Sequence, residues 1–184
     1  MITVKVLTHD DMPSYRSLRI AALTDHADAF GDTAEEFSRH SIEHLQKRLA
    51  ISAAAGGMSL GAFSKEQALV GTVNLSISDS DKSRHRAILW GMYVAPGHRH
   101  QKIGHALITA LLERAVANRA IFQIHLGVVT TNVGALSLYR KHGFVIYGTD
   151  PRALRVGSAF HDEYLMIKMM ASAPPVQPLP QEAG

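Results

Sequence analysis

The sequence predicts a mixed α/β fold, because segments with strand patterning alternate with segments with helical patterning along the chain. An apolar strand at 88–94 leads through a basic turn into a helix at 102–119, in which apolar residues recur at helical spacing. Earlier in the chain, strands at 58–63 and 69–77 are separated by a short polar loop and predict a hairpin. We therefore expect one sheet with helices packed against it.

Helix starts are predicted from capping residues, and strands from apolar runs or alternation. Asp10 and Asp11 precede a helix with Pro13 in its first turn, and Thr33 begins a capping box that starts a second helix. The strand at 88–94 is apolar almost throughout, which predicts a central position with both faces covered. The remaining predicted elements are a strand at 2–7, the second helix at 34–51, a strand at 122–129, a helix at 132–142, a strand at 144–148, a basic loop at 151–157 and a strand at 163–169.

Length and composition suit one compact domain, which we expect over residues 1–171, followed by a flexible Pro/Ala-rich tail at 172–184. The chain has no cysteine, which excludes disulfides and thiolate catalysis and is compatible with a reducing cytosol. No apolar stretch approaches the roughly 20 residues of a membrane span, so we expect a cytoplasmic protein without membrane attachment. A net charge of +3 does not require nucleic acid as a partner.

The junction between the strand at 88–94 and the following helix predicts a phosphate-binding turn. The start of a helix presents free backbone N–H groups and the positive end of the helix dipole to an anion. Arg99 and Lys102 add positive charge, and Gly104 allows the backbone to approach a ligand closely. We therefore expect an anionic group to bind here.

Two motifs in this region resemble those of the GNAT superfamily, the acyl-CoA-dependent N-acyltransferases. The first is the pyrophosphate-binding pattern Gln101-x-x-Gly104-x-Ala106 after a strand that ends near Pro96. The second follows in the family's order and consists of Asn132, Ala135, Tyr139, Gly143 and Phe144. The resemblance covers residues 2–170. It implies a mostly antiparallel central sheet with a splayed parallel strand pair, flanked by helices, and acetyl-CoA as the acetyl donor.

The resemblance also implies which residues bind the donor. Backbone groups of the splayed strand would hold pantetheine and polarise the thioester carbonyl. Gly91 in that strand indicates a bulge or a close backbone approach, and its alternative role is a packing gap beside Trp90. Many relatives carry glycine where this chain has His100 and Lys102, so we expect a stiffer and more cationic turn. The residues expected to bind acetyl-CoA are Met92, Tyr93, Val94, Arg99, His100, Gln101, Lys102, Ile103, Gly104, His105, Ala106, Asn132, Ala135 and Tyr139.

Tyr139 is our candidate for the general acid, because a phenol stays protonated at neutral pH and can supply a proton to the departing thiolate. Its alternative role is that of a core residue. Many relatives place a glutamate on the central strand, yet 87–94 contains no carboxylate. The general base is therefore left open between Glu36, whose alternative role is helix capping, and the other candidates, which are Glu35, His125, Asp162 and Glu163.

Acidic residues gather between the first two predicted helices, in the region that shapes the acceptor site in similar folds. They would attract a cationic acceptor, and their alternative role is that of solvated helix-capping residues. The residues expected to bind the acceptor are Asp28, Asp32, Glu35 and Glu36.

The leading functional hypothesis is an N-acetyltransferase that moves an acetyl group from acetyl-CoA to a primary amine of a small molecule, peptide or protein by direct attack in a ternary complex. The alternative is a non-catalytic CoA-binding sensor of the same fold, suggested by the missing carboxylate on the central strand. We expect no nucleic acid or membrane partner and leave a homodimer open. We also expect no metal, although His40 to His44 fits H-x-x-E-H, because a solvated helix face is the more common meaning of such a match.

Overall fold

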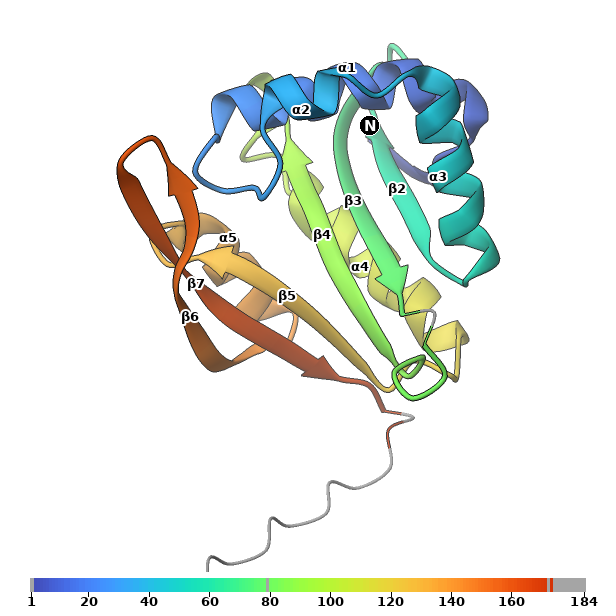
Figure 1. Cartoon of the computed structure of the whole chain (residues 1–184). Coiled ribbons are helices and arrows are strands. Elements are labelled where there is room, and N and C mark those ends of the chain that lie inside the picture. The colour runs from blue at the N-terminus through green and yellow to red at the C-terminus, as the bar shows by residue number, and fades with distance from the viewer. Residues whose placement is uncertain (1, 79, 172, 174–184) are drawn as a thin grey trace, which may run out of the picture.

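The structure, a computed structural model, describes residues 2–78, 80–171 and 173, and contains one seven-stranded sheet covered by helices (Figure 1). The order of strands across the sheet is β1-β2-β3-β4-β5-β7-β6. All neighbouring strands pair antiparallel except β4 and β5, which are parallel, so the predicted fold class is confirmed. The strands are β1 (Thr3–Val6), β2 (Met58–Phe63), β3 (Leu69–Ile77), β4 (Arg86–Val94), β5 (Gln123–Val129), β6 (Val145–Val156) and β7 (Ala159–Met169).

The helices begin close to the predicted caps. Asn132 caps its helix by accepting a hydrogen bond on Oδ1 from the Ala135 N–H at 3.0 Å. Asp11 precedes its helix as predicted, but its carboxylate accepts hydrogen bonds from Thr8 instead of capping the helix. The helices are α1 (Met12–Asp25), α2 (Ala34–Ser38), α3 (Ile42–Ala54), α4 (Ile103–Ala117) and α5 (Val133–Lys141), with short 3-10 turns at His9–Asp11 and Pro96–His98.

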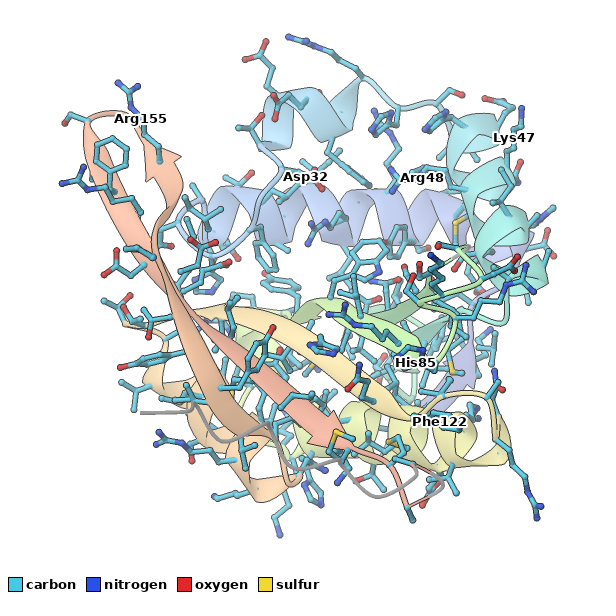
Figure 2. All side chains as sticks on the ribbon, turned by 60° about the horizontal axis from the view of Figure 1, so that its bottom comes forward. Asp32, Lys47, Arg48, His85, Phe122 and Arg155 are labelled. Atoms are coloured by element: carbon cyan, nitrogen blue, oxygen red, sulfur yellow. The ribbon has the colours of Figure 1, made fainter. Side chains whose placement is uncertain are left out.

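The parallel strands β4 and β5 are joined at only one end. Their pairing covers three residue pairs, from Arg86 with Gln123 to Ile88 with His125, and then stops. At this closed end the Phe122 N–H also donates to the His85 carbonyl at 2.8 Å, and Figure 2 shows the two side chains next to each other. Beyond it the strands diverge, so that β5, β6 and β7 lean away from the rest of the sheet (Figure 1).

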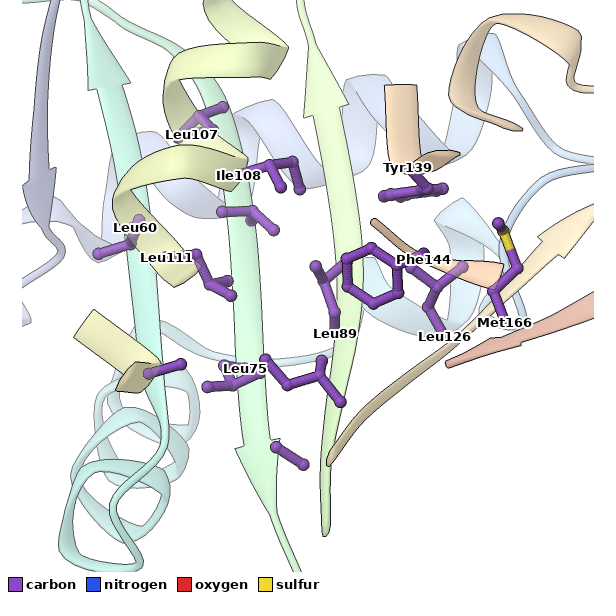
Figure 3. Packing of buried hydrophobic residues seen from close by; sticks show 14 of the residues in the cluster. Leu60, Leu75, Leu89, Leu107, Ile108, Leu111, Leu126, Tyr139, Phe144 and Met166 are labelled. Carbon is purple, nitrogen blue, oxygen red and sulfur yellow. The ribbon is translucent and has the colours of Figure 1, made fainter. Parts of the chain in front are cut away.

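The main hydrophobic core lies between the sheet and helices α4 and α5. Leu107, Ile108 and Leu111 of α4 are fully buried and pack over β2, β3 and β4. Tyr139 and Phe144 continue the same core on the far side of the opening between β4 and β5 (Figure 3). This core therefore holds both halves of the divided sheet against one pair of helices.

The predicted second helix at 34–51 is wrong, because the structure contains two helices, α2 and α3. The chain breaks after α2, and Ser41 starts the next helix by accepting the His44 N–H on its hydroxyl at 3.2 Å. Arg16 of α1 stabilises the break, since its guanidinium donates to the carbonyls of Ser38 and His40. The carbonyls of Ser38 and His40, which could otherwise accept hydrogen bonds within a continuous helix, are thus bound by a side chain of α1.

The predicted basic loop at 151–157 is also wrong, because this segment continues β6. Leu154 and Val156 pair with β7, while residues 151–153 form a bulge in which Arg152 has a φ of 57°. The bulge is held by a hydrogen bond from the Arg152 N–H to the Asp162 carboxylate at 2.8 Å. Figure 2 shows Arg155 near the tip of the resulting hairpin. Pro151 and Arg152 therefore lie in a bulge within β6 and do not end the strand.

Strand β4 is central, as predicted, but its two faces are not both covered. Leu89 points into the main core, whereas the neighbouring Ile88 is 55% exposed. The prediction failed because α1 and α3, which lie on this face of the sheet, pack mainly over β2 and β3 and leave Ile88 uncovered. The expected tail at 172–184 lies outside the described residues apart from Ala173. No helix in the described part of the chain is long and apolar enough to cross a membrane.

We predict that Leu111→Ala lowers the free energy of unfolding by about 2–5 kcal/mol, because the side chain is fully buried and its removal leaves a cavity. Val116→Ala, on the same helix but 59% exposed, should change it by no more than about 0.5 kcal/mol. Urea denaturation measures both values. Equal effects of the two substitutions would contradict the position assigned to α4.

Candidate active site

The divergence of β4 and β5 opens a cavity of about 320 Å³. Residues 88–92 form one wall and residues 127–129 form the opposite wall, so the cavity occupies the gap in the sheet. Asn132, Ala135 and Tyr139 of the α5 region close one side, and residues 29–32 of the loop between α1 and α2 close another. Arg19 and Glu163 also line it. The cavity therefore brings the second predicted motif together with charged side chains from α1 and β7.

Gly91 forms a bulge in β4, as its position in an apolar strand predicted. Its φ is +63°, and the register between β3 and β4 shifts at this point. A Cβ atom at Gly91 would lie 2.7 Å from Nδ2 of Asn74, so a side chain is excluded by space as well as by backbone conformation. The bulge redirects the end of β4 at the place where the cavity begins.

The predicted phosphate-binding turn has the form of an anion-binding nest. His100 and Lys102 both adopt left-handed conformations, with φ values of 64° and 60°, at the positions where glycine was expected in relatives. Within the described part of the chain, the backbone N–H groups of residues 100–105 have no hydrogen-bond acceptor. Free donors at the start of α4, together with its dipole, can receive an anion.

The residues expected to bind acetyl-CoA fall into two groups, with three exceptions. Met92, Asn132, Ala135 and Tyr139 line the cavity, and the residues from 100 to 106 form the turn and the first part of α4. The side chains of Tyr93 and Arg99 point elsewhere, toward the end of α1, and that of Val94 packs against the main core.

Tyr93 and Arg99 connect β4 to α1 through hydrogen bonds. The Tyr93 hydroxyl donates to the Asp25 carboxylate at 2.6 Å, and burial, followed by this contact, raises the pKa of Tyr93 to about 12. The Arg99 Nε donates to the Val94 carbonyl at 3.0 Å, and its Nη2 lies 2.9 Å from Nε2 of His26. These contacts fix the path of the chain between the bulge and the turn.

Tyr139 belongs both to the hydrophobic core and to the cavity lining. It is 6% exposed, and its hydroxyl has no hydrogen-bond partner among residues 2–78, 80–171 and 173. Burial raises the pKa of Tyr139 well above the ordinary value of a phenol. The side chain is therefore protonated at neutral pH and faces the cavity without a competing acceptor.

Three of the four acidic residues expected to bind the acceptor already have partners within the protein. Asp32 lines the cavity, and its carboxylate lies 3.2 Å from Nη2 of Arg19; Figure 2 shows Asp32 on the loop that joins the two helices. Glu35 forms an ion pair with Arg39. Of the four residues expected to bind the acceptor, Asp32 is the one that lines the cavity.

Glu36, a candidate base, lies in the capping box at the start of α2. Its carboxylate accepts hydrogen bonds from the Thr33 backbone N–H at 3.0 Å and the Thr33 hydroxyl at 2.8 Å. These two hydrogen bonds hold the pKa of Glu36 below its usual value, and the bond from the backbone N–H has the larger effect. The carboxylate is fully exposed and is not part of the cavity lining.

Sequence reasoning missed Arg19, which is a buried cation at the edge of the cavity. It is 3% exposed and stacks on Phe30, with its guanidinium carbon 4.5 Å from the ring centroid. Its Nε and Nη1 atoms have no hydrogen-bond partner among the described residues. The available signal was its position within the apolar stripe of α1, between Leu18 and Ala22, where a charge is unexpected.

The H-x-x-E-H match does not lie on one helix. His40 lies in the break before α3 and His44 lies in its first turn, with their rings stacked at a centroid distance of 4.5 Å. The predicted helical spacing of this pair is therefore wrong. Within the described ranges, no group of three or more His, Cys, Asp or Glu side chains has a metal-binding arrangement.

Residues 15–144 match the model of the acetyltransferase (GNAT) family. Because this match spans most of the chain, the protein belongs to the GNAT acetyltransferase family. The predicted resemblance is therefore confirmed. No curated protein matches the sequence.

Solved structures share the fold over nearly the whole chain. An acetyltransferase of the GNAT family from Streptococcus pneumoniae has a TM-score of 0.84 and 24% identity, covering 93% of this chain and 100% of that one. The ribosomal-protein-alanine N-acetyltransferase from Brucella melitensis has a TM-score of 0.79 and 22% identity, covering 91% and 99%. A phosphinothricin acetyltransferase from Sinorhizobium meliloti, in complex with acetyl-CoA, has a TM-score of 0.83 and 17% identity, covering 98% and 94%.

We predict that His100→Gly raises the free energy of unfolding by about 0.5–1 kcal/mol. A left-handed conformation costs a residue with a side chain about 1–2 kcal/mol, and the flexibility of glycine in the unfolded chain offsets only part of this gain. His98→Gly, at ordinary φ in the adjacent 3-10 turn, should instead lower it. Urea denaturation decides, and destabilisation by His100→Gly would contradict the strain assigned to the turn.

Proposed function

We propose that this protein is an N-acetyltransferase, which moves an acetyl group from acetyl-CoA to a primary amine by direct attack in a ternary complex. One observation supports this most strongly: Met92 lines the cavity between β4 and β5, and its side chain also lies against Gly104, just after the turn with free backbone N–H groups. A long donor with a phosphate group at one end and a thioester at the other fits these two features together. Membership in the GNAT family supports the same donor.

The diphosphate of the donor would bind the N–H groups of residues 100–105, with Lys102 supplying local positive charge. The pantetheine arm would then follow β4, whose edge beyond Ile88 has no strand partner on the β5 side. Free peptide groups around Met92 can bind the pantetheine amides and polarise the thioester carbonyl. This assignment uses the backbone of the segment and does not require the side chains of Tyr93 or Arg99.

The transfer requires four events. A base removes a proton from the acceptor ammonium, and the free amine nitrogen forms a bond to the thioester carbon. The carbon–sulfur bond then breaks, and the sulfur takes a proton from the Tyr139 hydroxyl. The proton shed by the new amide nitrogen restores the phenol. Holding both substrates together in one site supplies much of the rate.

The acceptor would approach from the open face of the sheet, where Asp32 lines the cavity. A carboxylate at this place favours a cationic amine. Two of the solved structures with this fold are named for different acceptors: one for a ribosomal-protein alanine and the other for phosphinothricin. The fold thus leaves the choice of amine to side chains, and our proposal for this protein is a primary amine.

A CoA-binding sensor of the same fold is the alternative, favoured by the absence of a carboxylate from the sequence of β4. Release of free thiol from acetyl-CoA in the presence of a panel of primary amines distinguishes the two functions. The proposed enzyme releases thiol in an amine-dependent manner, and a sensor binds acetyl-CoA without turnover. We further propose a cytoplasmic location, which the absence of cysteine supports.

We predict that Gly104→Val weakens binding of acetyl-CoA about tenfold or more. A Cβ atom at Gly104 would lie 3.0 Å from the Met92 side chain and 3.2 Å from Leu138, so a valine would fill the passage between α4, β4 and α5. Gly97→Val is the matched control, because a Cβ atom there meets nothing within 4 Å. Calorimetry measures both affinities, and an unchanged value for Gly104→Val would remove this turn from the site.

We predict that Tyr139→Phe lowers kcat by about 10²-fold while the affinity for acetyl-CoA changes little. Phenylalanine keeps the ring in the core and removes only the proton that the thiolate needs. The measurement is steady-state kinetics under conditions where chemistry limits turnover. An unchanged kcat would leave Tyr139 with its role in the core alone.

A further inference from the structure

The proposed transfer needs a base, and one carboxylate in the cavity is free to act as one. We propose that Glu163 is this general base, because its carboxylate lies over Gly127 inside the cavity that Tyr139 also lines. The inference rests on the proposed function. It identifies the group that removes the ammonium proton from the acceptor.

The position of Glu163 depends on a glycine on the neighbouring strand. Glu163 pairs with Val129, so its side chain lies diagonally across from Gly127 on the same face of the sheet. A Cβ atom at Gly127 would lie 2.8 Å from Oε2 and 3.5 Å from Oε1 of Glu163. The backbone of Gly127 does not adopt a positive φ. The carboxylate therefore occupies the space over Gly127, and a side chain at this position would displace it.

The Glu163 carboxylate has no hydrogen bond or ion pair with any residue in the described part of the chain. Burial, followed by the nearby charge of Asp150, raises the pKa of Glu163 above its usual value. A carboxylate with a raised pKa is a better proton acceptor than an exposed one. The Glu163 carboxylate is therefore not explained by a structural role as one half of an ion pair.

The other charged and titratable groups around Glu163 come from several elements. Arg19 and Asp32 line the same cavity from α1 and the following loop, and Tyr139 lines it from α5. Asp150 is the register partner of Glu163 on β6. His125 of β5 lies two residues from Gly127 and faces Tyr147, with Nδ1 3.4 Å from the hydroxyl.

The remaining base candidates from the sequence lie in less suitable places. Glu35 and Glu36 are engaged with Arg39 and Thr33, and Asp162 accepts the Arg152 N–H. His125 lines a separate cavity of about 360 Å³, which shares Gly127 with the first but does not include Tyr139. Among the candidates, Glu163 is the one that lines the cavity with the proposed acid.

The proton transfers balance as follows. Glu163 takes one proton from the acceptor ammonium, directly or through a water molecule, and leaves a neutral amine. After attack, the nitrogen loses its second proton, which replaces the one that Tyr139 gives to the sulfur. Glu163 returns its proton to solvent when the amide leaves. The products are the amide, free CoA thiol and one proton.

The test begins with the wild-type protein and the alkylamine that gives the fastest thiol release in an amine panel. We expect Glu163→Gln to lower kcat/KM by about 10²-fold at neutral pH. In the wild-type protein the acidic limb of the pH profile reflects loss of activity as pH falls and Glu163 becomes protonated; in the variant this limb should move up to the pKa of the amine, because without the base only the neutral amine reacts. A fluorinated analogue of the same amine, already neutral at the assay pH, should restore most of the activity of the variant.

A second pair of variants displaces the carboxylate without removing it. Gly127→Ala should lower kcat/KM as well, because its methyl group would occupy the space of Oε2. Gly148→Ala is the matched control, since its Cβ atom would lie 3.7 Å from Leu165, which is an ordinary contact. Glu163→Gln is not expected to lower the thermal midpoint, because burial disfavours the ionised carboxylate in the folded protein.

The possible outcomes distinguish a wrong assignment of Glu163 as the base from a wrong assignment of the acetyltransferase function. Unchanged kcat/KM and an unchanged acidic limb in Glu163→Gln, with an active wild-type protein, would overturn the role of Glu163 and leave the acetyltransferase intact. A loss that the fluorinated amine does not rescue would also overturn it, since a base is not needed for a neutral amine. Absence of thiol release from the wild-type protein with every amine would reject the proposed function itself.

Discussion

The structure depends on the point at which β4 and β5 stop pairing. Three residue pairs, together with the hydrogen bond from Phe122 to His85, close one end of the strand pair. Beyond Ile88 the backbone of β4 has lost its neighbour on one side, and the bulge at Gly91 redirects it further. An unpaired strand edge in a protein interior needs partners for its peptide groups. In the proposed complex, the pantetheine arm of the donor would supply them.

The cores on either side keep this opening from closing. Helix α4 packs over β2, β3 and β4, while Tyr139 and Phe144 pack on the side of β5 and β7. On the opposite face, Arg19 holds the loop after α1 through Asp32 and Phe30. The cavity is thus framed by packed elements, with a phenol on one side and an unpaired carboxylate on another. In the proposed mechanism, the phenol gives a proton to the leaving sulfur and the carboxylate takes one from the acceptor amine.

The sequence predicted the sheet, the helix starts and both motifs, because each depends on local periodicity, capping or glycine spacing. It failed at Ser41 and at Pro151, where contacts with distant residues, Arg16 and Asp162, decide the local structure. Arg19 and Glu163 show the same limit for the site. Arg19 was overlooked, and Glu163 was one base candidate among several, since only folding brings it over Gly127, 36 residues earlier in the chain.

The central claim is that the donor binds along the free edge of β4 and the turn before α4. Titration of ¹⁵N-labelled protein with acetyl-CoA, followed by amide chemical shifts, tests it most directly. The account predicts that the largest shifts occur at the backbone N–H groups of residues 92–94 and 100–105. Saturable binding with these amides unchanged, and with the largest shifts on the β6–β7 hairpin or α3, would contradict it.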